Sequence, residues 1–149
     1  KVISTPGHTL DHVIYYNKTN KSLFSGDTLF RLGCGRIFEG TYKIMHESLK
    51  KIEKLEDDTL VYGGHEYTLN NLKFLLSVFP DNKEIILEKE KINFQILKTK
   101  SSMPFVLGDE KKINPFLSSK SSYYQNYNKK NKLGDFELFT KLREKKDNF

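Results

Sequence analysis

The first part of the chain alternates short apolar stretches with turns. His12 to Tyr16 and Lys21 to Ser25 are apolar and aromatic, and the polar segment Asn17 to Asn20 lies between them. Two short apolar runs joined by a polar turn are typical of a β-hairpin. The residues from Lys1 to Ser4 and from Thr59 to Tyr62 predict two further strands. The hydrophobic pattern therefore predicts a sheet in this part of the chain.

A helical spacing of apolar residues begins after Gly40. Met45, Leu49 and Ile52 recur at intervals of three or four residues, and Thr41 is placed to cap the helix that they predict. This helix lies between two predicted strands. The order of strand, helix and strand indicates a layered α/β unit whose functional loops gather at one edge of the sheet.

Beyond Tyr67 the pattern becomes mainly helical. Apolar residues with helical spacing lie on both sides of the break at Pro80-Asp81-Asn82, namely Leu72, Leu76 and Phe79 before it and Ile85, Ile92 and Ile96 after it. A loop is predicted around Pro104, Gly108 and Asn114-Pro115-Phe116, followed by a segment rich in serine and tyrosine from Ser118 to Tyr127 and a closing helix marked by Phe136, Phe139 and Leu142. We therefore expect two domains, at residues 1–67 and at residues 68–149.

Composition narrows the class of protein. The hydrophobic content of 37% is typical of a globular chain, and no apolar run approaches the roughly 18 residues of a membrane-spanning helix. The net charge of +6 comes from lysines spread along the chain, which is typical of a solvated surface. No nucleic-acid-binding motif accompanies it. We expect neither a membrane nor a nucleic acid as a partner, whereas an anionic small molecule fits; the sequence gives no oligomeric state.

The single cysteine, Cys34, gives information on the cellular compartment of the protein and on whether a thiol takes part in its chemistry. One cysteine excludes an internal disulfide framework and agrees with a reducing compartment, so we predict the cytoplasm, with an organelle as the alternative. A loop thiol without an identified base favours a structural role for Cys34 over a nucleophilic one.

Three segments run from a strand-like stretch through glycine to a side chain that can bind a metal. They are Thr5-Pro6-Gly7-His8-Thr9, Ser25-Gly26-Asp27-Thr28 and Gly63-Gly64-His65-Glu66-Tyr67. Glycine permits tight turns there, so the two imidazoles and the carboxylate can project into one cleft. These side chains suit zinc, iron or manganese, although three ligands are few for a hydrolytic site.

Longer stretches of the sequence resemble a known family. The segments SGDTLFRLGCGRIFEGT, at residues 25–41, and GGHEYTLNNLKF, at residues 63–74, resemble glyoxalase II, the family of hydroxyacylglutathione hydrolases. The resemblance continues through Asn114-Pro115-Phe116 to Arg143 and the residues after it, up to Phe149. It implies an α/β fold, the later half of a metallo-β-lactamase αββα sandwich followed by a mainly helical C-terminal domain.

The resemblance also implies a site for two divalent metal ions, zinc with iron or manganese as alternatives. His8 would be a terminal ligand of one ion, His65 a terminal ligand of the other, and Asp27 the bridging and catalytic carboxylate. A carboxylate has two oxygens and can span two ions, which independently favours Asp27 as the bridge. The family's H-x-H-x-D-H cluster, with four further ligands, is absent from this sequence, and we expect it in a segment before Lys1. His12 stays outside the ligand set, because the family pattern makes it structural.

Glutathione carries carboxylates, so its recognition requires cations. The resemblance points to Arg36, Tyr67, Arg143 and Lys146 as substrate-binding residues, with the backbone around Ile37 and Phe38 lining the tripeptide. Arg36 stands where the family often has lysine, and Phe38 where it often has tyrosine, so a hydroxyl contact is lost at Phe38. The alternative for Arg143 and Lys146 is a basic helix end stabilised by the helix dipole.

The function implied is that of a thioester hydrolase. Hydroxide bound to the metals would attack S-D-lactoylglutathione, a 2-hydroxyacylglutathione, and release glutathione and D-lactate. We expect residues 1–149 by themselves to be inactive, since part of the metal site is missing. Two other functions are considered: a persulfide dioxygenase of the same fold with a single iron, and a non-catalytic binding module.

Overall fold

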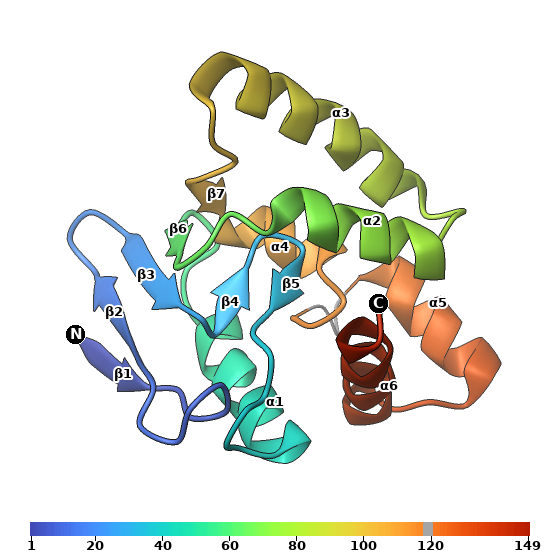
Figure 1. The fold of residues 1–149 in the computed structure, drawn as a ribbon, viewed down its shortest axis with the longest axis horizontal. Helices are drawn as coiled ribbons and strands as arrows, with labels where there is room; N and C mark the ends of the chain where they lie inside the picture. Colours follow the sequence, from blue (N-terminus) through green and yellow to red (C-terminus); the bar gives the residue numbers. More distant parts are fainter. Residues whose placement is uncertain (118–120) are drawn as a thin grey trace.

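A computed structural model describes residues 1–117 and 121–149 of the chain. Strands β1 to β3 gather at one end of the molecule and helices α5 and α6 at the other (Figure 1). The start of the predicted serine- and tyrosine-rich segment, at residues 118–120, lies outside the described residues. No helix in the described ranges combines the length and the apolar character needed to cross a lipid bilayer.

Two sheets are present among the described residues. The larger has the strand order β1-β2-β3-β6-β7 and the smaller pairs β4 with β5. The strands are β1 (Val2–Ser4), β2 (Val13–Asn17), β3 (Ser22–Gly26), β4 (Leu29–Phe30), β5 (Gly33–Cys34), β6 (Leu60–Gly63) and β7 (Phe105–Val106). Strands β1, β2 and β3 pair antiparallel, and β6 lies parallel to β3 after the crossover through α1. The predicted hairpin is confirmed by the pairing of Tyr16 with Leu23.

Six helices are present among the described residues. They are α1 (Tyr42–Glu53), α2 (Thr68–Val78), α3 (Lys83–Thr99), α4 (Leu107–Ile113), α5 (Ser122–Asn131) and α6 (Asp135–Asp147). The predicted cap of α1 is confirmed, because the Thr41 hydroxyl accepts a hydrogen bond from the Ile44 N–H at 3.2 Å. The predicted break is confirmed too, since Asn82 caps α3 by accepting hydrogen bonds from the N–H groups of Glu84 and Ile85.

The prediction of a continuous loop around Gly108 is wrong, because Phe105–Val106 form β7 and Leu107–Ile113 form α4. Gly108 lies in the first turn of α4 and donates its N–H to the Asp57 carbonyl at 2.8 Å. A Cβ at this position would lie 2.9 Å from the Asp57 carbonyl oxygen. The glycine therefore allows a close approach of two backbones and does not mark a break in secondary structure.

The predicted division at residue 67 stays a prediction, and one strand crosses it. Strand β7 belongs to the later residues, yet it pairs with β6 through Leu60 opposite Val106 and Val61 opposite Phe105. A continuous cluster of buried apolar side chains also joins Val61 of the sheet to Phe139 of α6. The two parts of the sequence therefore share a core.

The two faces of the large sheet differ in what covers them. Ile14 and Leu23 are fully buried in the cluster that includes Met45, Leu49 and Ile52 of α1. On the opposite face, the side chains of Val2, Tyr15 and Phe24, which pair in register across β1, β2 and β3, are 59%, 56% and 51% exposed. Helices of the described chain therefore cover one face of this sheet, while the other keeps an exposed apolar row.

The turn between β4 and β5 is surrounded by buried polar groups. Leu32 has a left-handed backbone with φ of +59°, and its N–H donates to the Glu110 carboxylate at 2.8 Å. The Asn114 amide donates to the same carboxylate oxygen at 2.9 Å, and the Asn71 amide donates to the Arg31 carbonyl at 3.0 Å. Helices α2 and α4, together with the residue that follows α4, thus hold this turn.

The Arg31 side chain adds α3 to these contacts. Its guanidinium donates to Glu88 at 2.7 Å, to Gln95 at 2.8 Å and to the Ser102 carbonyl at 2.7 Å. Arg31 and Glu88 are each only 7% exposed. Such a buried pair requires both partners, since removing one leaves an unpaired buried charge at a cost of about 3–5 kcal/mol.

The first prediction concerns Glu110, whose pKa burial raises to about 7 from an ordinary value near 4.5. Between these values the unfolded chain releases the proton while the folded chain keeps it. The free energy of unfolding should therefore fall as the pH rises through this window, by about 2 kcal/mol between pH 5 and pH 8. Glu110→Gln removes this contribution. The difference in free energy of unfolding between the variant and the original chain, measured by urea denaturation, should therefore shift in favour of the variant by that amount between pH 5 and pH 8. An equal pH dependence of both proteins would contradict the prediction.

Candidate functional site

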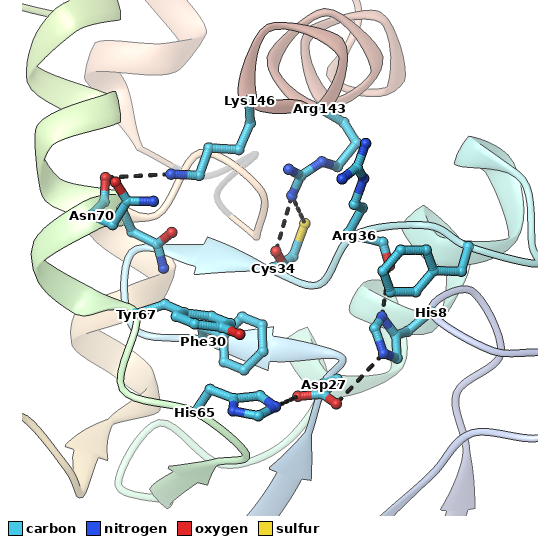
Figure 2. Close-up of a pocket in the computed structure, with 12 residues that line it drawn as sticks. His8, Asp27, Phe30, Cys34, Arg36, His65, Tyr67, Asn70, Arg143 and Lys146 are labelled. Atoms are coloured by element: carbon cyan, nitrogen blue, oxygen red, sulfur yellow. Dashed lines mark hydrogen bonds and ion pairs between the residues drawn. The ribbon is translucent and has the colours of Figure 1, made fainter. Parts of the chain in front are cut away.

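The three predicted ligands lie at the same edge of the large sheet. His8 follows β1, Asp27 follows β3 and His65 follows β6, and the strand pairings make these three strands run in the same direction. His8 Nε2 is 3.5 Å from Asp27 Oδ2, and His65 Nε2 is 3.4 Å from Asp27 Oδ1. Figure 2 shows the two imidazoles approaching the carboxylate from different sides. The structure thus brings the three side chains together.

Gly64 makes this close approach possible. A Cβ at Gly64 would lie 2.8 Å from Asp27 Oδ1, and its N–H donates to the Gly26 carbonyl at 2.8 Å. Any other residue would push the two loops apart. The glycine before His65 therefore has a steric role at the carboxylate itself.

The hydrogen bonds of His8 suit a cation between its ring and Asp27. His8 Nδ1 lies 2.8 Å from the Arg36 carbonyl oxygen. A carbonyl only accepts, so Nδ1 carries a proton, and Nε2 is the ring nitrogen that faces Asp27. A histidine whose other ring nitrogen is fixed by a backbone carbonyl is the usual arrangement of a metal-binding histidine.

The carboxylate of Asp27 has the remaining capacity that a bridging ligand needs. Asp27 Oδ1 is buried and accepts no hydrogen bond from the described residues. No group of three or more His, Cys, Asp or Glu side chains within the described ranges is arranged to enclose a metal ion. His8, Asp27 and His65 thus offer donor atoms that suit a divalent metal ion, but these three side chains do not form a closed metal site by themselves.

His12 supports the backbone of Asp27. Its Nε2 accepts the Asp27 N–H at 3.1 Å, and its Nδ1 lies 3.1 Å from the Thr5 hydroxyl and 3.0 Å from the Thr28 hydroxyl. Burial, with the nearby His8, lowers the pKa of His12, which favours the neutral ring that can accept this hydrogen bond. Both ring nitrogens are thus engaged by the protein, as suits a residue outside the ligand set.

The three residues open onto a cavity of about 490 Å³. Its lining includes the predicted Arg36, Phe38, Tyr67, Arg143 and Lys146, together with Phe30, Cys34, Asn70 and Asn71 (Figure 2). Prediction missed these last four, although all lie in the stretches that resemble glyoxalase II. Ile37 is outside this lining, and its side chain packs against the core.

Aromatic rings form the wall beside His65. Tyr67 stacks on the His65 ring with centroids 5.0 Å apart and planes at 18°, and the Phe30 ring meets Tyr67 edge-on at 5.2 Å. Tyr67 is 48% exposed. The stacking fixes the plane of His65 and leaves the Tyr67 side chain accessible from the cavity.

The three cations of the cavity differ in their freedom. The Arg36 side chain is 59% exposed, whereas Arg143 is 4% exposed and donates to the carbonyls of Cys34 at 3.0 Å and Gly35 at 3.4 Å. Lys146 donates to the Asn70 carbonyl at 3.3 Å. Arg143 is therefore largely engaged within the protein, and Arg36 is the cation most open to a ligand.

Cys34 is a poor candidate for a nucleophile. It is 6% exposed, and burial raises the pKa of its thiol even though Arg143 lies beside it. A protonated buried thiol reacts slowly. The structure thus supports the structural role expected for Cys34.

Comparisons with known proteins cover the whole chain. Residues 66–149 match the family model for the hydroxyacylglutathione hydrolase C-terminus, and residues 1–65 match the model for the metallo-beta-lactamase superfamily. The chain is 44% identical over 148 residues to the hydroxyacylglutathione hydrolase of Hamiltonella defensa, covering 99% of this chain and 59% of the relative. It is 47% identical to that of Bartonella tribocorum, covering 99% and 58%. The chain thus spans less than two thirds of the length of these curated relatives.

The solved structures bear on the fold. A metallo-beta-lactamase from Staphylococcus aureus superimposes on 95% of this chain and 34% of its own, with a TM-score of 0.55 and 22% identity. At that identity the likeness concerns the fold alone. Together with the superfamily match, it confirms the predicted metallo-β-lactamase fold.

The second prediction concerns Lys146. Burial, with the nearby charge of Arg143, lowers its pKa to about 8. Roughly half of the Lys146 amine is then neutral at pH 8, and only the neutral amine reacts with acylating reagents. Limited acetylation at pH 8, followed by peptide mass spectrometry, should modify Lys146 faster than its exposed neighbour Lys145. Equal or slower labelling of Lys146 would contradict this expectation.

Proposed function

Since this chain belongs to the hydroxyacylglutathione hydrolase family of the metallo-β-lactamase superfamily, we propose that the enzyme containing it hydrolyses S-D-lactoylglutathione to glutathione and D-lactate. The family predicted from the sequence is confirmed by these matches. One observation carries the proposal. One cavity is lined by the His8, Asp27 and His65 group and, away from it, by the cationic side chains of Arg36 and Lys146 (Figure 2). These two parts of the lining suit the thioester and the carboxylates of one substrate.

The superfamily implies divalent metal binding, and the ligand assignment is part of the proposal. His8 would serve one ion, His65 the other, and Asp27 both; zinc is proposed, with iron or manganese as alternatives. The remaining ligands would come from the region of the relatives that this chain does not cover. Bound ions would supply hydroxide at neutral pH and stabilise negative charge on the thioester oxygen.

The protein's own groups keep the ligands in place. The Arg36 carbonyl fixes the proton of His8 on Nδ1, which leaves Nε2 free for a metal. His12 holds the backbone N–H of Asp27, and Tyr67 stacks on His65. Each proposed ligand is thus oriented by a contact of its own before a metal binds.

The cationic part of the cavity suits the tripeptide. Arg36 and Lys146 would pair with glutathione carboxylates through charge-assisted hydrogen bonds. Phe38 is 66% exposed and lies 5.9 Å from the Arg36 guanidinium, so its ring can pack beside the peptide. The backbone at Ile37 stays part of the predicted lining. Arg143, predicted as a direct ligand, would act chiefly by holding Cys34 and Gly35.

The proposed partner is a small glutathione thioester and neither a nucleic acid nor a membrane. The cations argued to bind it converge inside one cavity, which suits a small anion better than an extended polyanion. We propose the cytoplasm as the location, because the single buried Cys34 agrees with a reducing compartment. A persulfide dioxygenase and a binding module remain the alternatives to be tested.

The third prediction separates these functions. A full-length hydrolase carrying this sequence should release glutathione from S-D-lactoylglutathione without consuming oxygen, and Asp27→Asn should abolish the release because an amide is a poor bridge between two cations. Asp109→Asn, which removes an exposed carboxylate of α4, is the matched control. Purified residues 1–149 should show negligible turnover. Oxygen consumption with a persulfide and no thioester hydrolysis would overturn the proposal.

The fourth prediction concerns the cationic part of the cavity. Arg36→Met combined with Lys146→Met should raise the KM of the full-length enzyme at least tenfold with little change in kcat, since hydrogen bonds to charged groups contribute about 1.5–3 kcal/mol each. Lys145→Met, an exposed position of the same helix, is the control. Steady-state kinetics measure both parameters. An unchanged KM in the double variant would exclude these cations from substrate binding.

A further inference from the structure

One carboxylate oxygen joins two cations of the cavity that come from distant parts of the sequence. Asp147 Oδ1 is 3.0 Å from Arg143 Nη2, one helical turn earlier on α6, and 3.6 Å from Arg36 Nε. The side chain of Asp147 is 23% exposed. Asp147 itself does not line the cavity, so its contact with the substrate site runs through Arg36 and Arg143, which do line it.

The two arginines are held very differently. Arg143 has a side chain 5% exposed, and its Nη1 donates to the carbonyls of Cys34 and Gly35. Arg36 has no comparable anchor among the described residues. Its guanidinium meets Asp147 through Nε and lies 5.9 Å from the Phe38 ring. Arg143 is thus the fixed support of Asp147, and Asp147 is the support of Arg36.

This geometry leaves the useful face of Arg36 open. Because Nε pairs with Asp147, the two Nη groups remain free, and none of the described residues accepts a hydrogen bond from them. Two parallel Nη–H donors match the two oxygens of a carboxylate. A guanidinium already held in position loses less conformational freedom when it binds.

We propose that Asp147 is a positioning residue for substrate recognition, which holds Arg36 over the cavity so that its Nη groups bind a carboxylate of the glutathione moiety. The proposal rests on the proposed function for the identity of that ligand. Asp147 does not line the cavity, and its ion pairs are with Arg36 and Arg143 and not with the proposed metal ligands. Its effect is therefore confined to the affinity for ligands that bear carboxylates.

The charge of Asp147 and its positioning role lead to opposite predictions for the affinity of the Asp147→Asn variant. Asp147→Asn removes a negative charge from the neighbourhood of an anion, which by electrostatics alone would strengthen the binding of a carboxylate. It also weakens the support of Arg36, which would weaken binding. If Asp147 acts by positioning, the second effect dominates and the variant binds less tightly.

The test measures binding of S-methylglutathione, which cannot be hydrolysed, to the full-length enzyme that carries this sequence, by isothermal titration calorimetry. Asp147→Asn should raise Kd roughly three- to tenfold. Glu144→Gln is the matched control, because it removes one negative charge from an exposed position of the same helix, and it should change Kd less than twofold. An unchanged or lower Kd for Asp147→Asn, or no binding by the original enzyme, would overturn the proposal.

A double-mutant cycle separates positioning from a loss of structure. In an Arg36→Met background, Asp147→Asn should no longer raise Kd, because the residue through which it weakens binding is absent. If Asp147→Asn weakened binding equally in both backgrounds, the role would be structural and the proposal wrong. This experiment measures binding and not hydrolysis. A failure of thioester hydrolysis in the full-length enzyme would therefore refute the proposed function without changing the conclusion about Asp147.

Discussion

The buried turn between β4 and β5 is the constraint on which the site depends. Its backbone adopts a left-handed conformation at Leu32, a residue that is fully buried and has a Cβ. A conformation of this kind persists only where surrounding contacts determine it. Here the Glu110 carboxylate accepts the N–H of Leu32, and the Arg31 guanidinium is paired with Glu88. Satisfying these polar groups inside the molecule requires three helices to sit at fixed positions around the turn.

This turn explains why the sheet and the helices form a common site. Phe30 and Cys34 flank it, so the groups that hold the turn also place an aromatic wall and the loop leading to Arg36. Arg143 then closes the arrangement by donating from α6 to the carbonyl of Cys34. The edge of the sheet that carries His8, Asp27 and His65 and the part of the cavity that carries the cations are thus connected through short-range contacts.

Local features of the sequence could be predicted because local physics produces them. The cap at Thr41 and the break before α3 depend on neighbouring residues. The glycine-led loops and the family resemblance predict that His8, Asp27 and His65 lie together, as they do, while their role as metal ligands stays a prediction. The contacts that could not be predicted are non-local: nothing near Gly108 indicates that it must fit against Asp57, and nothing near Leu32 indicates that a glutamate of α4 will accept its N–H. Such contacts exist only once the chain has folded.

The exposed apolar row on the large sheet has a consequence for strand register. Tyr15 and Phe24 are apolar on the open face, while Ile14 and Leu23 are apolar on the covered face. A slip of one residue between strands would exchange one apolar set for the other, so hydrophobicity alone distinguishes the two alignments poorly. The hairpin turn must supply the distinction, and it does so with Asn17, whose side chain accepts the Thr19 N–H at 3.0 Å. A short polar turn thus determines which aromatic rings face the core.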